Sequence, residues 1–516
     1  MRNRWLFAAV FFGGVTSLGL EMTASRLLGN VFGTSNIVWA NIIGLILVYL
    51  SAGYFIGGRW ADRSPRESTF YSLLAWAAFT AGLVPLAARP VLRLAAAAVE
   101  RLDAAVMAGS FLSVLVLFIL PVTLLGCVSP FAIRLAIRDA EQAGRISGRV
   151  YAVSTLGSIL GTFLPVLWLI PSIGTALTFL VLSLSLLAVA LVGLWMLQPK
   201  AALKYLWMPF VLVGLAWWVL SEPIKASAGQ IYETESAYNY IQVVEHDGTR
   251  CLLLNEGQGI HSVYSPGGGA TYGTWDYFLA APFFNPPPVS LGPVARVGII
   301  GLAAGTIARQ YTDVFGPIPI DGWEIDPQIV EVGRRLFDMN EPNLNVIVAD
   351  GRWGLAHSAE EYSVIGVDAY RLPYIPPHLT TREFFEEARR HLRGDGVLVV
   401  NVGRTPDDRR LVDAMVGTIG AVFPSVHVVD VPNTFNTILY ATVQSTSADS
   451  LRENLLALTR EGAPSLLLDV LQRTYANLRP TPISDVVFTD DKAPIEQLTN
   501  SMVIRFVLSG DLDILR

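Results

Sequence analysis

The stretch ARVGIIGLAAGT (295–306) opens the segment that decides the fold of the second half of this chain. Three further runs follow it up to residue 370, namely WEID (323–326), VADG (348–351) and VIGVDAY (364–370). An acid closes each of these later runs: Glu324, Asp350 and Asp368. Because ligands of parallel α/β sheets bind beyond the carboxyl ends of the strands, acids after three successive strands predict a nucleoside pocket.

Strand-like and helix-like runs alternate through residues 294–445. The expected strands are ARVGIIG, PIDGWEID, NVIVAD, SVIGVDAY, GVLVVNV, VHVVDV and NTILYATV, separated by helical stretches such as 327–337 and 381–392. Alternation of this kind predicts a mainly parallel sheet with helices on both faces. We therefore expect an α/β Rossmann-like nucleoside-binding domain over 293–450, followed by a helical C-terminal extension over 451–516.

A small antiparallel β domain is predicted before it, over 223–292. Two apolar runs flank the pair Asp247-Gly248, a dipeptide typical of tight hairpin turns, and GIHSVYS (259–265) continues as a third strand. The run TYGTWDYFLAAPFF (271–284) is expected to form a short helix that presents Trp275, Asp276 and Tyr277.

The first 222 residues predict an all-α polytopic membrane domain. The chain is 52% hydrophobic and 16% charged, and the apolar excess lies in this half. Seven runs approach the roughly 20 residues that a helix needs to cross a bilayer: 5–20, 36–58, 70–88, 107–127, 150–170, 175–197 and 203–220. We expect the first run to be a membrane helix, since no small-residue cleavage pattern of a signal sequence follows it.

Charge separates the two halves and excludes one class of partner. Residues 1–222 carry 15 Lys and Arg against 8 Asp and Glu, and the remainder has a net charge of −13. An acidic soluble half argues against nucleic acid and is compatible with a cationic substrate.

Basic loops on alternate sides of the spans predict a cytoplasmic N-terminus by the positive-inside rule. With seven spans, the soluble part then lies outside the cytoplasm, although Arg89, Arg93 and Arg101 on the opposite side weaken that assignment. Glu21 and Arg26 at the end of the first span are either functional intramembrane charges or interfacial residues that pair or snorkel.

The proposed pocket suggests a role for each of its residues. Gly301 and Gly305 let a ligand approach the backbone, and Glu324 is placed to accept hydrogen bonds from both hydroxyls of a ribose. Asp350 is placed to meet the base edge or the neighbouring backbone. Asp368 faces the reacting end, where it would orient an amine and accept its proton. The alternative is that these acids only cap the helices that follow.

Aromatic and sulfur-containing side chains add little specific chemistry. Tyr370 and Tyr374 are candidates to hold a cation over their rings. Cys127 and Cys251 lie far apart in the chain, so neither a disulfide framework nor a metal site is predicted.

These motifs, in this order, resemble the spermidine synthases, a family of polyamine aminopropyltransferases. The resemblance is carried by ESAYNY (235–240), LNEG (254–257), GLAAGT, WEID, VADG, and VDAY followed by HLTTREFF (378–385). TDDKAP (489–494) and the membrane half, with its ExxxxR and GxxS patterns, are similar to membrane-fused relatives of that family.

The resemblance implies a β domain on a methyltransferase-like Rossmann domain, with decarboxylated S-adenosylmethionine as the aminopropyl donor. It implies that Glu324 binds the ribose, that Asp350 with Gly351 meets the adenine, and that Asp368 is the catalytic base. Tyr238 and Asn239 stand where a Tyr-Gln pair is usual, which makes Asn239 a donor-side candidate and Tyr238 an acceptor-side one. Related soluble enzymes assemble as dimers or tetramers, so a homodimer is among the implied assemblies.

Departures from the family pattern concern the acceptor side. Arg371 occupies the position where a second aspartate is typical, and a cation there repels a diamine unless it points away. Glu256 and Asp276 are candidate substitute carboxylates, and His261 and His378 are candidates for acid or base work, with a structural role as the alternative for each histidine.

The leading hypothesis is therefore a multi-pass membrane aminopropyltransferase acting on an amine such as putrescine. A non-catalytic nucleoside-binding or polyamine-binding module coupled to the membrane half is the alternative from another class. A methyltransferase that uses S-adenosylmethionine is the third, because Arg371 could pair with the carboxylate of that donor.

Overall fold

The computed structural model describes residues 2–32, 36–99, 105–137, 139–220, 227–255, 259–292, 294–370 and 374–508. The chain forms two compact units. The first comprises residues 1–227 together with the short segment Glu233–Tyr240, and the second comprises residues 228–232 and 241–516. The first is called the helical unit and the second the α/β unit below.

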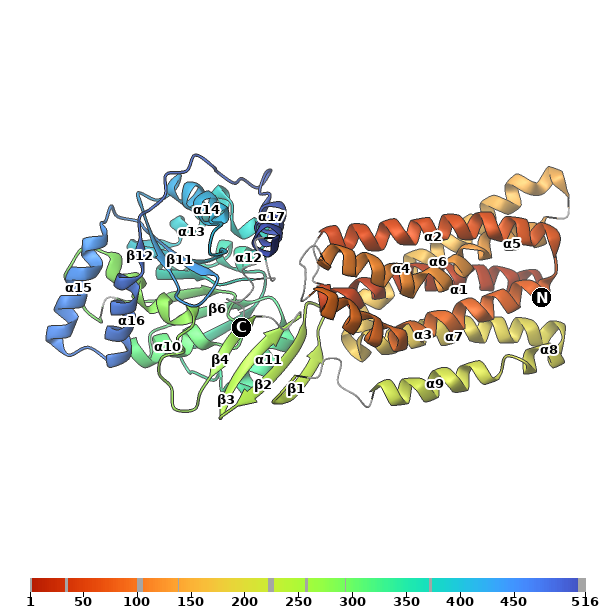
Figure 1. The fold of residues 1–516 in the computed structure, drawn as a ribbon, viewed down its shortest axis with the longest axis horizontal. Helices are drawn as coiled ribbons and strands as arrows, with labels where there is room; N and C mark the ends of the chain where they lie inside the picture. Colours follow the sequence, from red (N-terminus) through yellow and green to blue (C-terminus); the bar gives the residue numbers. More distant parts are fainter. Residues whose placement is uncertain are drawn as a thin grey trace. The chain divides into compact units, whose positions relative to one another are not determined.

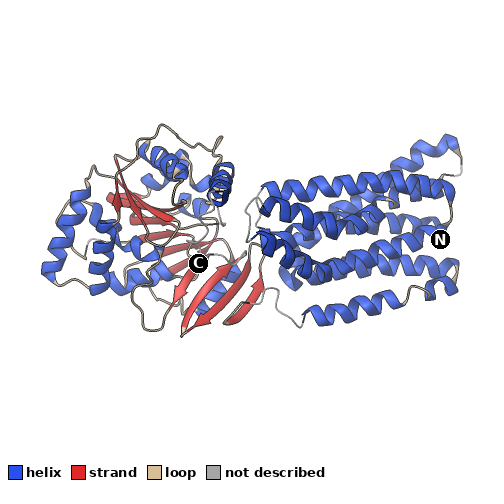
Figure 2. Ribbon diagram, in the orientation of Figure 1, coloured by secondary structure: helices blue, strands red, loops and turns tan. Residues whose placement is uncertain are grey.

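The helical unit consists of long helices that run side by side (Figures 1 and 2). In chain order they are α1 (Arg2–Phe32), α2 (Asn36–Arg63), α3 (Glu67–Val99), α4 (Ala105–Gly126), α5 (Val128–Ala136), α6 (Ala143–Leu164), α7 (Ile170–Leu197), α8 (Pro199–Leu203) and α9 (Trp207–Leu220). A π-helical turn, η2 (Pro165–Leu169), joins α6 to α7, and a 3₁₀ turn, η1 (Ala140–Gln142), precedes α6.

Five stretches among the described residues are long and apolar enough to cross a membrane. One of them, Ala143–Leu197, is 55 residues long because α6 continues through η2 into α7. Within α7, the backbone of Gly174 is not helical. The structure thus supports several apolar helices of spanning length, while the number of seven spans stays a prediction.

Small residues allow α1 and α6 to pack closely. A side chain at Gly157 would place its Cβ 2.1 Å from the carbonyl oxygen of Phe11, and one at Gly161 would lie 2.2 Å from that of Val15. Both separations are far below van der Waals contact, so these positions exclude any larger residue. Glycine-mediated contact of two apolar helices is typical of membrane proteins.

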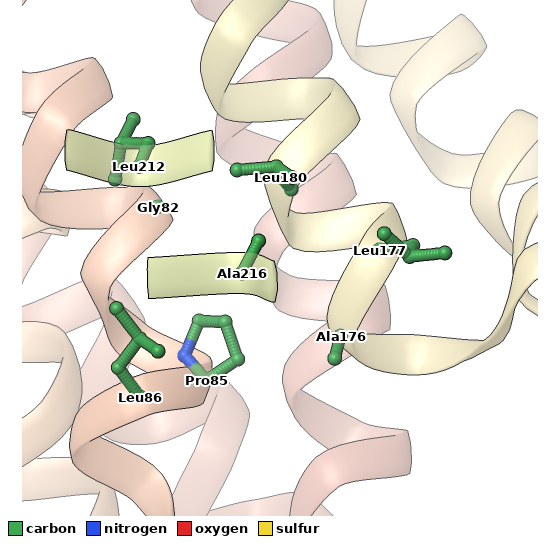
Figure 3. Close-up of a pocket in the computed structure, with 8 residues that line it drawn as sticks. All are labelled: Gly82, Pro85, Leu86, Ala176, Leu177, Leu180, Leu212 and Ala216. Carbon is green, nitrogen blue, oxygen red and sulfur yellow. The ribbon is translucent and has the colours of Figure 1, made fainter. Parts of the chain in front are cut away.

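A small cavity in the helical unit lies between α3, α7 and α9 (Figure 3). Its lining consists of eight residues: Gly82, Pro85, Leu86, Ala176, Leu177, Leu180, Leu212 and Ala216. All eight are Gly, Ala, Leu or Pro, so the lining of this cavity is apolar.

A four-stranded antiparallel sheet precedes the large sheet. Its strands, in spatial order, are β1 (Gln230–Glu235), β2 (Tyr240–His246), β3 (Thr249–Leu254) and β4 (Ile260–Tyr264). The predicted hairpin is confirmed: His246 pairs with Thr249, and Asp247 and Gly248 turn the chain with φ of 51° and 78°. A 3₁₀ helix, η3 (Thr274–Phe284), follows where a short helix was expected.

The large sheet has eight strands in the order β12-β10-β11-β9-β8-β5-β6-β7. Their bounds are β5 (Val297–Ile300), β6 (Ile320–Glu324), β7 (Leu344–Val348), β8 (Tyr362–Val367), β9 (Leu392–Gly403), β10 (Ser425–Asp430), β11 (Asn436–Thr442) and β12 (Leu478–Arg479). The seven predicted strands are all present, and the short β12 is an addition. Strands β5 to β9 are parallel to one another, whereas β11 is antiparallel to both β9 and β10.

Helices cover both faces of this sheet, each over its own apolar core. One core includes side chains of η3, α10 (Thr306–Phe315), α11 (Pro327–Leu336), α15 (Ala448–Glu461) and α16 (Ser465–Ala476). The other includes α12 (Gly351–Ala356), α13 (Arg382–Arg390), α14 (Arg410–Gly420) and α17 (Ile495–Leu508), with η4 (Pro377–Leu379). The Rossmann-like architecture predicted from the sequence is confirmed.

The strand order fixes where a ligand binds. From β5 the chain proceeds outward to β6 and β7, then returns so that β8 pairs with the other side of β5. Neighbouring loops therefore leave β5 and β8 in opposite directions, and the crevice at such a switch point is where open α/β sheets bind ligands. The glycine turn follows β5 and Asp368 follows β8.

Candidate functional site

The glycine turn between β5 and α10 is shaped by the backbone that it touches. Gly301 has φ of 84°, and a Cβ on it would lie 2.7 Å from the carbonyl oxygen of Asp368 and from the backbone of Ala369. Gly305 has φ of 85°, and its Cβ would meet the side chain of Met339 at 2.6 Å. Glycine is thus required at both positions, and the turn lies directly against the backbone of the predicted base.

Glu324 closes β6 and is bonded to the glycine turn. Its Oε2 accepts the amide N–H of Ala303 at 2.9 Å, and its Oε1 accepts that of Asp326 at 3.0 Å. Burial raises the pKa of Glu324 to about 7, although the backbone hydrogen bonds oppose that shift. The cap of α11 is supplied by Asp326, which accepts the N–H of Gln328. Helix capping therefore does not account for Glu324.

Asp350 closes the loop after β7 and has two partners. Its Oδ1 accepts the N–H of Trp353 at 3.0 Å and so caps α12, while its Oδ2 lies 2.9 Å from Nε2 of His378. Asp350 is therefore a helix cap, as the alternative interpretation predicts, and it also contacts His378 through its second oxygen. Gly351 follows, and a Cβ on it would lie 2.3 Å from the side chain of Ile300.

A network of ion pairs holds the segment that carries His378. Arg352 donates to the carbonyl oxygen of His378 at 3.0 Å and forms paired hydrogen bonds with Glu387 and with Asp490. Asp490 also accepts from the hydroxyl of Thr381 at 2.7 Å. The TDDKAP motif thus acts through Asp490, which fixes the loop beside Asp350.

Asp368 lies in the loop directly after β8, at the switch point. Its backbone N–H donates to the carbonyl oxygen of Ile300 at 2.9 Å, and its Oδ1 accepts from the amide of Asn401 at 2.8 Å. Burial raises the pKa of Asp368 to about 7, and hydrogen bonds from Asn401 and Trp275 oppose the shift. A carboxyl group with a pKa near neutrality can both accept and release a proton at physiological pH.

Asn401 connects Asp368 to its surroundings. Its Oδ1 accepts from the amide of Asn436 at 2.9 Å, which fixes the amide of Asn401 as the donor toward Asp368. The hydroxyl of Tyr370 donates to the carbonyl oxygen of Asn401 at 3.1 Å. Tyr370 is thereby held beside the aspartate, and Tyr374 is bonded through its hydroxyl to Asn500.

The structure gives Asp276 a different environment from that of a substrate-binding acid. Its side chain is completely buried and accepts hydrogen bonds from Thr271, Tyr272 and Gln310, and it pairs with Arg473 at 2.9 Å. Each carboxylate oxygen has at least two partners from the protein. This arrangement favours a structural role over the predicted replacement of a missing acceptor-side carboxylate.

His261 lies on β4 with a largely enclosed ring. Burial lowers its pKa to about 4, so the imidazole is neutral at pH 7. Its buried Nε2 has no hydrogen-bond partner among the described residues. The adjacent Ser262 accepts the amide N–H of Ala304 at 3.0 Å, which joins β4 to the glycine turn.

The remaining acceptor-side candidates and the donor-side candidate Asn239 lie elsewhere in the chain. Tyr238 and Asn239 are in the turn between β1 and β2, within the segment that belongs to the helical unit. Glu256 and Arg371 lie outside the described residues, so their predicted roles stay predictions.

The described residues hold no group of three or more His, Cys, Asp and Glu suited to a metal ion. Cys127 and Cys251 are free thiols.

Two residues of the site had no role in the sequence-based prediction. Asn401 lies near the carboxyl end of the buried strand β9, and a polar side chain at that place was a signal for it. Trp275 was placed on a short helix, but nothing local indicated that it reaches Asp368.

This sheet order, with acids at three strand ends around the switch point, defines a Rossmann-like transferase of the methyltransferase fold class. The sequence profile of the spermine/spermidine synthase domain matches residues 294–454. The chain is 33% identical over 303 residues to a probable polyamine aminopropyl transferase of Bifidobacterium longum, a match that covers 56% of this chain and 64% of that protein.

A polyamine aminopropyltransferase of Vibrio vulnificus is 31% identical over 239 residues, covering 43% of this chain and 75% of the relative. The chain belongs to the polyamine aminopropyltransferase family. Among solved structures, a probable spermidine synthase from Corynebacterium glutamicum aligns with a TM-score of 0.39 at 20% identity, over 50% of this chain and 98% of that one.

Proposed function

We propose that this protein transfers an aminopropyl group from decarboxylated S-adenosylmethionine to an amine such as putrescine. The observation that carries the proposal is Asp368, a carboxylic acid with a pKa near 7 that lies at the switch point against the glycine turn. Membership of the family supplies the class of reaction, and the site supplies a base where the reaction needs one.

In the proposed reaction, the lone pair of the amine nitrogen attacks the methylene carbon next to the sulfonium. The carbon–sulfur bond breaks, and its electron pair neutralises the sulfur to give methylthioadenosine. The new ammonium then loses a proton to Asp368. Alignment of nitrogen, carbon and sulfur contributes much of the rate, since a positioned pair of reactants reacts far faster than a free pair.

The donor is expected to lie across the ends of three strands. Glu324 would accept the two ribose hydroxyls, and Asp350 with Gly351 would face the adenine. Asp350 already carries His378 on its second oxygen, so we propose His378 as a positioning residue for that acid. The sulfonium would then lie toward Asp368 at the switch point.

The most direct functional test uses the purified full-length protein in detergent or nanodiscs. Decarboxylated S-adenosylmethionine and putrescine are added, and methylthioadenosine and spermidine are measured by mass spectrometry. We expect equal amounts of the two products. Binding of the donor without release of methylthioadenosine would reject the reaction and favour a nucleoside-binding module.

We propose that the helical unit spans a bilayer. Large apolar side chains are exposed on its long helices, including Phe55 of α2 at 72% and Phe163 of α6 at 58%. Exposed apolar surface on helices of spanning length is stable in lipid and costly in water.

We also propose that the α/β unit lies on the non-cytoplasmic side of the membrane. Two helices indicate this: Arg26 near the end of α1 and Thr175 near the start of α7 both bond to the segment Glu233–Tyr240. Basic residues lie at the other ends of these helices, Arg2 and Arg4 on α1, Lys200 and Lys204 after α7. By the positive-inside rule the basic end is cytoplasmic, which leaves the segment on the opposite side.

Cysteine labelling tests this sidedness. In a protein without its native cysteines, Ser290→Cys on the soluble part is expected to react with an impermeant maleimide added to intact cells. Gln142→Cys, at the basic end of the helices, is the matched control and should react only after permeabilisation. The reverse pattern would place the soluble part in the cytoplasm.

A further inference from the structure

The turn that carries Tyr238 and Asn239 is compact and internally bonded. The N–H of Ser236 donates to the carbonyl oxygen of Asn239 at 2.8 Å, which closes the turn. The hydroxyl oxygen of Ser236 accepts the N–H groups of Tyr238 at 3.0 Å and of Asn239 at 2.8 Å. Because these hydrogen bonds hold the turn together, a group that binds the turn fixes the backbone positions of both Tyr238 and Asn239.

Arg26 of α1 binds this turn, which belongs to the same unit as the helix. Its guanidinium donates to the carbonyl oxygen of Tyr238 at 3.0 Å and also to that of Ser236. The planar fork of arginine can bind two carbonyl oxygens at once, which a lysine ammonium does with less geometric control. Arg26 is one of the two charged residues that the sequence singles out at the end of the first span, and the structure pairs it with these two backbone carbonyl groups.

Glu235, which precedes the turn, is bound by α7. Gly174 has φ of 78°, so the backbone leaves helical geometry and a new helical segment starts at Thr175. The carboxylate of Glu235 accepts the N–H of Thr175 at 2.8 Å and its hydroxyl at 3.0 Å. A carboxylate at a helix N-terminus satisfies an otherwise free N–H and is favoured by the helix dipole.

We propose that α1 and α7 serve as a platform that positions Tyr238 and Asn239, and that Arg26 and Glu235 are positioning residues for substrate binding. All four contacts lie within the helical unit, to which Glu233–Tyr240 belong. The inference rests on the proposed function, because the roles of Tyr238 and Asn239 come from their place in the family motif.

Kinetics of the full-length protein test the platform. Arg26→Gln and Glu235→Gln each remove a charged hydrogen-bonding group, and we expect the KM for amine or donor to rise about tenfold or more. The kcat at saturation is expected to change by less than about threefold, because Asp368 is untouched. Arg26→Lys should recover part of the loss. Arg149→Gln, an arginine of the same unit that lies over the ring of Phe7, is the matched control and should behave as wild type.

Hydrogen exchange provides a readout that needs no activity. Arg26→Gln is expected to speed the exchange of the amides of Tyr238 and Asn239 severalfold, with the apolar helices unchanged. If wild type forms product while both Gln variants keep their KM within twofold, the platform is rejected. If exchange at the turn is unchanged in Arg26→Gln, it is rejected as well, whether or not the protein forms product. Inactive wild type with faster exchange in the variant would remove the proposed reaction and leave the platform standing.

Discussion

Replacing Asp368 by asparagine is the perturbation that probes the chemistry most sharply. The substitution preserves the size of the side chain and removes only its ability to ionise. The amide of Asn401 can still donate to the remaining oxygen, so this hydrogen bond is kept in the variant. Because loss of a general base costs about 10²–10⁴-fold in rate, we expect kcat to fall within that range at pH 8.

The pH dependence follows from the raised pKa of Asp368, about 7. The carboxylate is the active form, so its fraction increases with pH, from about 1% at pH 5 to about 90% at pH 8. The amine acceptor must also lose a proton, and this adds its own slope to the raw profile. The ratio of wild-type to variant rates removes that slope, since the acceptor is common to both. We expect the ratio to rise about tenfold per pH unit below 7 and to level off above it.

The thermal stability of the two proteins provides an independent control. The contribution of Asp368 to stability falls as pH rises, whereas its activity as a base increases. A carboxyl group whose pKa is raised by folding contributes stability while protonated, and that contribution is lost as pH rises through about 7. Asparagine cannot lose a proton. The difference in Tm between Asp368→Asn and wild type should therefore be more positive at pH 8 than at pH 5. A variant that retains activity within about threefold, or a ratio that is flat between pH 5 and 8, would refute the assignment of Asp368 as the base.

Three further substitutions separate the neighbouring roles. Asn401→Leu removes a hydrogen bond that lowers the pKa of Asp368, so the rising limb of the pH–rate profile should move to higher pH; an unmoved limb counts against this contact. Asp276→Asn removes the charge of a buried carboxylate that pairs with the partly exposed Arg473, and should lower the free energy of unfolding by about 3 kcal/mol in denaturant, leaving the limb in place. Glu324→Gln should weaken methylthioadenosine binding by about 10–100-fold in calorimetry, and unchanged binding would exclude a contact of Glu324 with the ribose.

The fold was predictable because its signals are local. Buried strands such as VGIIG and VLVVNV are short apolar runs with turn residues at their ends. The hairpin is indicated by the dipeptide Asp247-Gly248, which is typical of a two-residue turn. The short strand β12 was missed because two residues, Leu478 and Arg479, carry no periodic pattern. Its pairing with β10 depends on a contact across some fifty residues of chain.

The site was predictable to the extent that strand ends determine it. Glu324, Asp350 and Asp368 were placed by the rule that parallel strands present their carboxyl ends to the ligand, and the structure puts each at such an end. Spacing alone could not distinguish capping from binding, because Asp326 and not Glu324 caps α11. That distinction depends on which atoms the backbone brings within hydrogen-bond reach.

The features that the sequence could not predict depend on contacts between segments that are far apart in the chain. Asp276 looks like a free carboxylate in the sequence, yet Arg473, almost two hundred residues later, is its partner. Arg26 is read from the sequence as a charge at the end of a span, and only the structure brings it to the backbone of Tyr238. No periodicity records such pairs, since each is set by packing of elements that are far apart in the chain.

The proposal that this chain is an aminopropyltransferase with Asp368 as its base is tested most directly by one assay. Full-length wild type and Asp368→Asn are each supplied with decarboxylated S-adenosylmethionine and putrescine at pH 8, and methylthioadenosine and spermidine are counted. We predict equal amounts of both products from wild type and a rate lower by at least about a hundredfold from the variant. Bound donor with no methylthioadenosine from wild type, or equal rates from the two proteins, would contradict the account.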